Sequence, residues 1–321
     1  MDRFEGRIAV VTGGGTGMGR ELVVALAREG CHVALCDVSE EAMQQTRALA
    51  RAAAPAGTRV TTHRADVSSA AEVAAFRDAV AREQASEHVN LLFNNAGIGG
   101  GGSFVLDDAG EWEKTFDVCW RGVYLCTRAF LPLLLRSDAG HVVNTSSVNG
   151  FWASIGPFTA HTAYSAAKFA VRGFTEALVN DFRLNAPHLR ASVVMPGHIG
   201  TSIVTNSARI LGRDPKQMSD EEVLQVRERI ARMGFPVDGL GTEQIRQAMI
   251  ERAERFREDA PMSAAEAAKV ILDGVRANRW RILVGEDAHV LDEMVRADPE
   301  GAYDAAFYGE LVRRTGWRLG V

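Results

Sequence analysis

Short apolar runs rich in β-branched residues alternate along the first two thirds of the chain with longer stretches in which apolar residues recur at helical spacing. The runs predict six strands and one more near the end, at residues 7–12, 32–37, 59–63, 89–93, 141–145, 190–195 and 281–284. The stretches between them predict helices at residues 18–29, 40–53, 70–84, 111–135 and 162–185. Strands that are apolar on both faces and separated by helices are typical of a parallel sheet covered on both sides, so we predict a doubly wound α/β fold.

Two segments depart from this alternation. Residues 202–262 are charged, helical in pattern and interrupted by a Gly-Phe-Pro sequence, and we expect a helical insertion after the sixth strand that forms a substrate lid over the carboxyl edge of the sheet. Residues 287–321 are acidic and then aromatic, which predicts a final helix and a C-terminal extension. The only low-complexity tract is a run of four glycines at residues 99–102. We interpret residues 1–321 as a single catalytic domain of the Rossmann type that contains both segments.

The composition is that of an ordinary globular protein. Hydrophobic residues make up 46% of the 321 residues and charged residues 24%, which excludes general disorder and a coiled-coil rod. The formal charge of −5 gives no electrostatic basis for binding nucleic acid. No uninterrupted apolar run reaches the length of about 18 residues that a spanning helix needs, because the best candidate contains Arg128 and Pro132. We therefore expect neither a nucleic-acid partner nor a membrane span.

Cysteine usage and the N-terminal sequence bear on the compartment. The four cysteines form no C-x-x-C pair, so the sequence predicts no zinc or other metal site. Cys31 and Cys36 are an odd number of residues apart near one predicted strand and should face opposite sides, which argues against a disulfide. The first strand begins without a preceding signal region. Free thiols and the missing signal favour a cytoplasmic protein.

A glycine-rich turn with the sequence TGGGTGMG, residues 12–19, joins the first predicted strand to the first helix. Glycines permit a tight turn and close approach of backbone N–H groups to a ligand, and the helix N-terminus behind them favours an anion. Similar glycines also occur in a tight turn of any α/β protein. As a pyrophosphate site, the turn offers these candidate cofactor ligands: Gly13, Thr16, Gly17, Met18 and Gly19.

An acidic residue, Asp37, ends the second predicted strand. Dinucleotide sites place a carboxylate about 20 residues after the glycine turn, where it binds the ribose 2′-hydroxyl group. A carboxylate at this place would repel a 2′-phosphate, and the following Val38 and Ser39 supply no arginine to bind one. Asp37 and Val38 are therefore candidate ligands of NAD rather than NADP. The alternative is that Asp37 caps the next helix, a role that Ser39 could fill instead.

Tyr164 and Lys168 are four residues apart on a predicted helix and so share one face. The ordinary pKa of tyrosine is about 10, and a nearby ammonium group lowers it. Such a tyrosine can exchange a proton with an alcohol or carbonyl oxygen. The fifth strand ends in Ser146 and Ser147 at the same sheet edge, where a hydroxyl group could bind that oxygen. A surface Tyr-Lys pair next to two loop serines would give the same pattern.

Together these motifs resemble those of the short-chain dehydrogenase/reductase family. The resemblance covers residues 7–201 and is carried by Thr12-Gly13 with Gly17 and Gly19, Asp66-Val67, Asn94-Asn95-Ala96-Gly97, Ser147, Tyr164 with Lys168, and Pro196-Gly197 before Ile199 and Thr201. For the cofactor, it implies that Asp66 and Val67 contact the adenine and that Ile199 and Thr201 hold the nicotinamide carboxamide. The remaining implied cofactor contacts are Asn95, Ala96, Gly97, Tyr164, Lys168, Pro196 and Gly197.

The resemblance also implies an activity. Tyr164 would be the acid/base, Lys168 its electrostatic partner and a ribose ligand, and Ser147, rather than Ser146, the partner of the substrate oxygen. The expected reaction is the NAD-dependent interconversion of a hydrophobic secondary alcohol, such as a hydroxysteroid, terpenoid alcohol or aryl carbinol, and its ketone. Members are commonly homotetramers or homodimers, and the helices at 111–135 and 162–185 are the candidate interfaces here. An NADP-dependent carbonyl reductase is the alternative enzyme.

One position departs from the family pattern. Many members carry an asparagine in a V-N-x-x-G stretch, where it is assigned to a proton relay that ends at the lysine, and Cys119 stands in its place here. A thiol is a weak donor and acceptor of hydrogen bonds. Cys119 is a candidate catalytic residue. A degenerate NAD-binding sensor or scaffold with weak catalysis is the corresponding alternative function.

The connection between Ser147 and Tyr164 is long and aromatic, and includes Phe151, Trp152, Phe158 and His161. It predicts either an aromatic wall of the substrate pocket or an insertion that packs on the lid or on another subunit. His161 is a candidate second acid/base, or a helix-entry histidine that binds backbone. The candidate substrate residues are Asn149, Trp152, His161 and His198, with Met195 as a further pocket residue.

Overall fold

The computed structural model describes residues 3–157, 159–232, 236–237, 239–317 and 319. In this part of the chain, seven parallel strands form one sheet with the order β3-β2-β1-β4-β5-β6-β9. The strands are β1 (Ile8–Thr12), β2 (His32–Asp37), β3 (Val60–Arg64), β4 (Leu91–Asn94), β5 (Gly140–Thr145), β6 (Leu189–Pro196) and β9 (Arg281–Val284). The doubly wound Rossmann sheet is confirmed, and strand ends differ from the expected ones by at most two residues.

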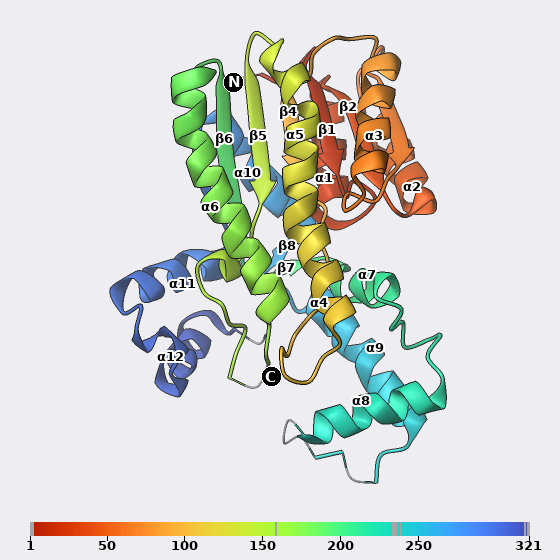
Figure 1. Cartoon of the computed structure of the whole chain (residues 1–321), viewed down its shortest axis with the longest axis vertical. Helices are drawn as coiled ribbons and strands as arrows, with labels where there is room; N and C mark the ends of the chain where they lie inside the picture. Colours follow the sequence, from red (N-terminus) through yellow and green to blue (C-terminus); the bar gives the residue numbers. More distant parts are fainter. Residues whose placement is uncertain (1–2, 158, 233–235, 238, 318, 320–321) are drawn as a thin grey trace.

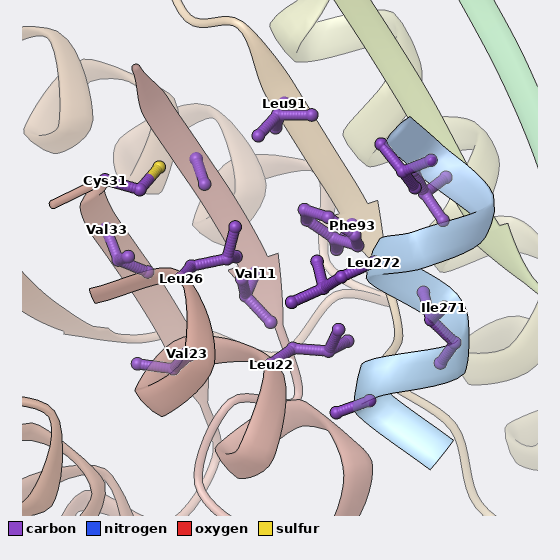
Figure 2. Close-up of a cluster of buried hydrophobic side chains, with 14 of the residues drawn as sticks. Val11, Leu22, Val23, Leu26, Cys31, Val33, Leu91, Phe93, Ile271 and Leu272 are labelled. Carbon is purple, nitrogen blue, oxygen red and sulfur yellow. The ribbon is translucent and has the colours of Figure 1, made fainter. Parts of the chain in front are cut away.

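Helices cover both faces of the sheet (Figure 1). One face packs against α1 (Gly17–Arg28), α2 (Glu40–Ala53) and α10 (Ala264–Arg276), and the other against α3 (Ala70–Glu83), α5 (Gly122–Leu135) and α6 (Thr162–Asn185). Alternate side chains of β1 point to opposite faces of the sheet. Val11 lies in the apolar core on the first face, and Val10 lies in the apolar core on the second. This double burial is why the strands are continuous apolar runs in the sequence. Figure 2 shows the first core, with Leu272 of α10 beside Leu22 of α1 and Phe93 of β4.

The helix expected at 111–135 has an interruption. It consists of α4 (Ala109–Phe116), a π-helical turn at Asp117–Arg121, and α5. Such turns insert one residue into a helix and are frequent at functional sites. Among the described residues, this continuous stretch, Ala109–Leu135, is the one helix that passes for a membrane span by length and composition, although half of its most apolar window is buried inside the fold. Burial of this kind is typical of a core helix.

A helical segment follows β6 at the carboxyl edge of the sheet. It contains α7 (Ile203–Ile210), α8 (Asp220–Arg232) and α9 (Thr242–Glu258). Two short parallel strands, β7 (Ile199–Gly200) and β8 (Met262–Ser263), pair where the chain leaves and returns. We call residues 202–262 the insertion. Its helices lie beyond the strand ends in Figure 1, on the side where α6 begins.

The C-terminal residues form α11 (Glu286–Ala297), a 3-10 turn (Gly301–Tyr303) and α12 (Ala305–Thr315). We call residues 298–317 the C-terminal extension. Together with α11 it encloses a third apolar core, which also includes Val193 and Met195 of β6 and Trp152 of the connection between β5 and α6. The extension therefore packs against the main fold within the same chain.

Candidate active site

The glycine turn lies at the point where the strand order reverses, between β1 and β4. In open α/β sheets, ligands bind at the carboxyl ends of the strands at such a point. Gly13 and Gly17 have positive φ angles of 62° and 54°. A Cβ atom at Gly19 would lie 2.1 Å from the Gly13 carbonyl oxygen, and one at Gly13 would lie 2.8 Å from the Cα atom of Ala96. Only glycine therefore fits at positions 13 and 19, where the turn packs against its own backbone and against Ala96.

The segment after β4 holds the glycine turn in place. The Asn95 side chain donates hydrogen bonds to the carbonyl oxygens of Thr12 and Gly13, both at 3.2 Å. In return, the Thr12 hydroxyl accepts the N–H groups of Asn95 and Ala96 at 3.0 and 3.1 Å. Asn95 and Ala96 thus act on the cofactor site by fixing the turn.

The turn and the start of α1 fit a pyrophosphate group. No described side chain caps the N-terminus of α1, and the first turn holds no acidic residue. Its N–H groups are therefore available to an anion. The hydroxyl group of Thr16 instead accepts a hydrogen bond from Asn206 of the insertion at 3.0 Å. Thr201 faces the turn, because a Cβ atom at Gly17 would lie 3.3 Å from its side chain.

Asp37 faces the glycine turn. One carboxylate oxygen accepts the N–H group of Gly15 at 3.0 Å and the other accepts that of Ser39 at 3.0 Å. Ser39 itself caps α2 by accepting the N–H group of Ala42. The residue that caps α2 is therefore Ser39 and not Asp37, which was the alternative role of Asp37. Arg64 is the neighbour of Asp37 across the β2–β3 pair, an arginine that the residues next to Asp37 in the sequence did not reveal.

Asp66 follows β3 and pairs with Lys114 of α4 at 2.7 Å. Its other oxygen accepts the backbone N–H and hydroxyl groups of Ser68. Burial would raise the pKa of Asp66, but the bonds from Lys114 and Ser68 outweigh it and hold this pKa below the usual range. Val67 packs tightly over Gly122, where a Cβ atom would lie 2.7 Å from its side chain.

The two serines after β5 have different partners. The buried Ser146 hydroxyl donates to the carbonyl oxygen of Lys168 at 2.8 Å, so it ties the strand end to α6. The Ser147 hydroxyl accepts the N–H group of Asn149 at 3.2 Å and hydrogen bonds to Tyr164. The geometry therefore places Ser147, and not Ser146, beside the tyrosine.

Tyr164 and Lys168 lie together on α6, with Lys168 Nζ 5.2 Å from the centre of the tyrosine ring. Lys168 is buried, and its ammonium group donates to the Thr145 carbonyl oxygen at 2.9 Å. Burial raises the pKa of Tyr164 above its usual value, while the charge of Lys168 and the bond with Ser147 lower it. Lys168 thus acts in the expected direction, but the expectation of a lowered tyrosine pKa is wrong for this structure, because desolvation is the larger effect.

The Pro-Gly turn after β6 is fixed by a buried carboxylate. Asp287, in the first turn of α11, accepts the N–H group of His198 at 2.6 Å. A Cβ atom at Gly197 would lie 2.3 Å from its oxygens, so this position requires glycine. Burial raises the pKa of Asp287. The Ile199 side chain packs in the first core, which leaves its backbone as the part that can reach a cofactor.

Residues 7–210 match the family model of short chain dehydrogenases. The chain belongs to the short-chain dehydrogenase/reductase family.

Relatives and solved structures agree with this assignment. SadH of Mycobacterium tuberculosis, named as an oxidoreductase, is 33% identical over 92% of both chains. Levodione reductase of Leifsonia aquatica is 35% identical over 70% of this chain and 81% of its own. The crystal structure of a short-chain dehydrogenase/reductase from Burkholderia phymatum in complex with NAD superposes with a TM-score of 0.74 at 29% identity, covering 94% of this chain and 96% of that one.

In this short-chain dehydrogenase/reductase, Cys119 lies in the π-helical turn and is completely buried. Its sulfur accepts the N–H group of Ile98 at 3.4 Å and donates to the Ile98 carbonyl oxygen at 3.1 Å. A Cβ atom at Gly97 would lie 3.6 Å from this sulfur and 3.5 Å from Lys168 Nζ. The thiol therefore anchors the backbone beside Lys168, which makes Cys119 a positioning residue.

One residue of the candidate aromatic wall, Trp152, lies in the third apolar core. Trp152 is 1% exposed and donates to the carbonyl oxygen of Ala302 at 2.7 Å. Its ring contacts those of Phe307 and Trp317. Trp152 is thus a core residue under the C-terminal extension of the same chain and not a wall of the pocket. Phe158 lies outside the described residues.

The other candidate substrate residues separate into two groups. Asn149 donates to the carbonyl oxygens of Trp152 and Ser154. The His198 ring donates to the Phe256 carbonyl oxygen of α9 at 2.7 Å. These two side chains bind backbone, and Met195 lies in the third core.

His161 lies next to the tyrosine, with ring centres 4.7 Å apart. Burial lowers the pKa of His161 to about 4, so its ring is neutral near pH 7. Sequence reasoning missed Lys114 and Asp287, because each reaches the site from a distant element.

Proposed function

We propose that this oxidoreductase uses NAD to interconvert a hydrophobic secondary alcohol and its ketone. The observation that carries the proposal is the Ser147–Tyr164–Lys168 group at the carboxyl edge of the sheet, in which Ser147 and Lys168 are buried and Tyr164 is half-buried, next to a turn that fits a pyrophosphate. Asp37 beside Gly15, and the NAD complex of the Burkholderia phymatum structure, support NAD as the cofactor. NAD would supply the hydride acceptor or donor.

The residues of the chain would then handle the proton. In alcohol oxidation, the Tyr164 phenolate removes the hydroxyl proton while the carbon loses hydride, and in ketone reduction the tyrosine returns that proton. The Ser147 hydroxyl orients the substrate oxygen. The Lys168 ammonium group, held by the Thr145 carbonyl, favours the phenolate against the effect of burial.

The surroundings of the site support a hydrophobic substrate. Phe104 and Val105, on the loop between β4 and α4, are 77% and 88% exposed. This loop contacts the insertion through an ion pair between Asp107 and Arg229 at 2.6 Å. We propose that the insertion serves as the substrate lid and that the exposed apolar side chains border the entrance.

We also propose that the protein is a homo-oligomer in a reducing compartment such as the cytoplasm. Tyr124 on α5 and Phe169 on α6 expose apolar surface on the helices expected to form an interface. The four buried free thiols support the compartment. Sedimentation of Phe169→Glu should show a smaller species than the unchanged protein if α6 lies in the interface.

The decisive experiment is NADH formation at alkaline pH across hydrophobic secondary alcohols, with Tyr164→Phe as the control. Turnover that is lost in Tyr164→Phe would support the proposal and rank the substrate classes. Tight NAD binding without turnover on any alcohol or ketone would contradict it and favour an NAD-binding sensor or scaffold.

A further inference from the structure

The glycine run at residues 99–102, which we call the glycine segment, contacts the first turn of α6. The carbonyl oxygen of Gly102 accepts the N–H group of Thr162, and that of Gly101 accepts the N–H group of Ala163, both at 3.0 Å. The Thr162 hydroxyl lies 3.0 Å from the Gly102 oxygen and 3.2 Å from the Gly101 oxygen, and its single O–H group can donate to either of them. The segment therefore supplies the partners that the first N–H groups of a helix lack.

No described side chain caps this helix, since its N-cap residue, His161, makes no such bond. The backbone of the glycine segment takes that place. Tyr164 lies in the same first turn, so the bonds that fix the start of α6 also fix the position of the tyrosine along and around the helix axis.

Close packing explains the glycines at positions 100 and 101. Gly101 has a φ angle of +58°, and its Cβ atom would lie 2.5 Å from the Cβ atom of Ala163 and 3.0 Å from the Cα atom of Trp112. A Cβ atom at Gly100 would lie 2.7 Å from the side chain of Leu211. A side chain at either position would push α6 or the residues after α7 away from the segment.

Two N–H groups of the segment link it to the insertion, one directly and one through Glu111 of α4. That of Gly99 donates to the Ser207 hydroxyl of α7 at 2.8 Å. That of Gly101 donates to Glu111 at 2.7 Å, and the same carboxylate oxygen binds Arg213 of the insertion at 2.9 Å. One short backbone segment thus binds α6 through two carbonyl groups and connects to the insertion through two N–H groups, that of Gly99 directly and that of Gly101 through Glu111.

We propose that the glycine segment is the positioning element of Tyr164 and that it transmits the placement of the insertion to this tyrosine. The inference rests on the proposed function, in which Tyr164 transfers the proton. A displacement of α7 changes the hydrogen bonds at Gly99 and Gly101, and hence the start of α6. Misplacement of a reacting group by about 1 Å costs on the order of 100-fold in rate.

The main test compares Gly101→Ala with Gly57→Ala. Gly57 also has a positive φ angle, +88°, but no described atom lies within 4 Å of its Cβ position, so it controls for backbone strain alone. We expect Gly101→Ala to lower kcat on the order of 100-fold while the Kd for NAD stays that of the control. Equal kcat values for the two variants would overturn the proposal.

Hydroxyl variants of Thr162 give a second test that creates no clash. Thr162→Ser keeps the donor to Gly101 and Gly102 and should retain kcat, whereas Thr162→Val removes it and should lower kcat. Ser207→Ala removes the bond from Gly99 and should also lower kcat. Unchanged turnover in Ser207→Ala would overturn the link to the insertion, and equal turnover of the Thr162 variants would overturn the positioning role.

Ionisation of Tyr164 gives a readout that needs no turnover. Phenolate absorption is followed against pH in each variant and in the same variant with Tyr164→Phe, and the difference gives the midpoint of this tyrosine. The midpoint should move in Gly101→Ala and Thr162→Val and stay in Gly57→Ala and Thr162→Ser. An unmoved midpoint in all four would overturn the inference, whereas absent turnover in the unchanged protein would contradict only the proposed function.

Discussion

At the scale of single residues, Asp37 shows how one carboxylate can shape the cofactor site through hydrogen bonds to the backbone. Its two oxygens bind the N–H groups of Gly15 and Ser39, which keeps the negative charge beside the glycine turn. Each carboxylate oxygen can accept further hydrogen bonds, so ribose hydroxyl groups can join these partners. A 2′-phosphate at the same place would meet an uncompensated negative charge.

We therefore predict that Asp37→Ala weakens NAD binding and strengthens NADP binding. Hydrogen bonds to charged groups contribute about 1.5–3 kcal/mol, so the loss in NAD affinity should be about 10-fold or more. Arg64, the neighbour of Asp37 across the β2–β3 pair, is the cation expected to attract the 2′-phosphate once the carboxylate is gone. Titration calorimetry with both cofactors measures the change, and the double variant with Arg64→Ala is the control. An unchanged preference would show that Asp37 does not select the cofactor.

The pH dependence of oxidation follows from the environment of Tyr164. Because burial raises its pKa above the usual value of about 10, the phenolate fraction, and hence kcat for alcohol oxidation, should still increase with pH in the alkaline range. Lys168→Met removes the charge that lowers this pKa, so the rise should move to higher pH as well as lose amplitude. Rate profiles of the two proteins check this, and a rise that moves to lower pH would contradict it.

At the scale of elements, the π-helical turn and the end of β4 are joined through one thiol. Cys119 satisfies both backbone groups of Ile98, and this bond pair fixes the chain beside Lys168. Its place in the family pattern is that of an asparagine, which also offers a donor and an acceptor. In this chain the thiol uses both its donor and its acceptor capacity on the backbone of Ile98.

Cys119→Ala should destabilise the protein more than Cys126→Ala does. Both cysteines are buried and both changes remove one sulfur atom, but only the first leaves Ile98 N–H and C=O groups unpaired. The additional loss should be about 1–3 kcal/mol in the free energy of unfolding. Urea denaturation measures it, and Cys119→Asn should recover most of the loss. Equal destabilisation by the two alanine variants would show that Cys119 does not anchor Ile98.

At the scale of the whole molecule, the C-terminal extension packs against the loop that joins Ser147 to α6. Trp317 donates to the Ile155 carbonyl oxygen at 3.0 Å, and the N–H group of Ala153 donates to the Tyr303 hydroxyl at 3.2 Å. Residues more than 140 positions apart thus hold the loop that joins Ser147 to α6. This packing makes the extension a structural part of the site.

Trp317→Ala should lower the free energy of unfolding by about 3–5 kcal/mol, the usual cost of removing a buried aromatic side chain. Trp280→Ala is the matched control, because Trp280 is 43% exposed and its loss should cost less. Equilibrium unfolding in urea compares the two variants. A larger loss for Trp280→Ala would mean that the extension contributes little to stability.

The sequence by itself determined the features that depend on neighbours along the chain. Apolar runs predicted the parallel sheet, since its central strands are buried on both faces, and glycine spacing predicted the turn before α1. The four-residue spacing of Tyr164 and Lys168 predicted their shared helix face. In each case the physical cause is local: backbone conformation, helical periodicity or the alternation of a strand.

The tertiary structure decided the features that depend on distant partners. The net direction of the Tyr164 pKa results from burial by several elements, and the buried place of Trp152 results from an extension more than 140 residues further on. The role of the glycine run at 99–102 follows from its contacts with α6 and α7. Desolvation and packing are properties of the folded molecule, so no pattern within one segment contains them.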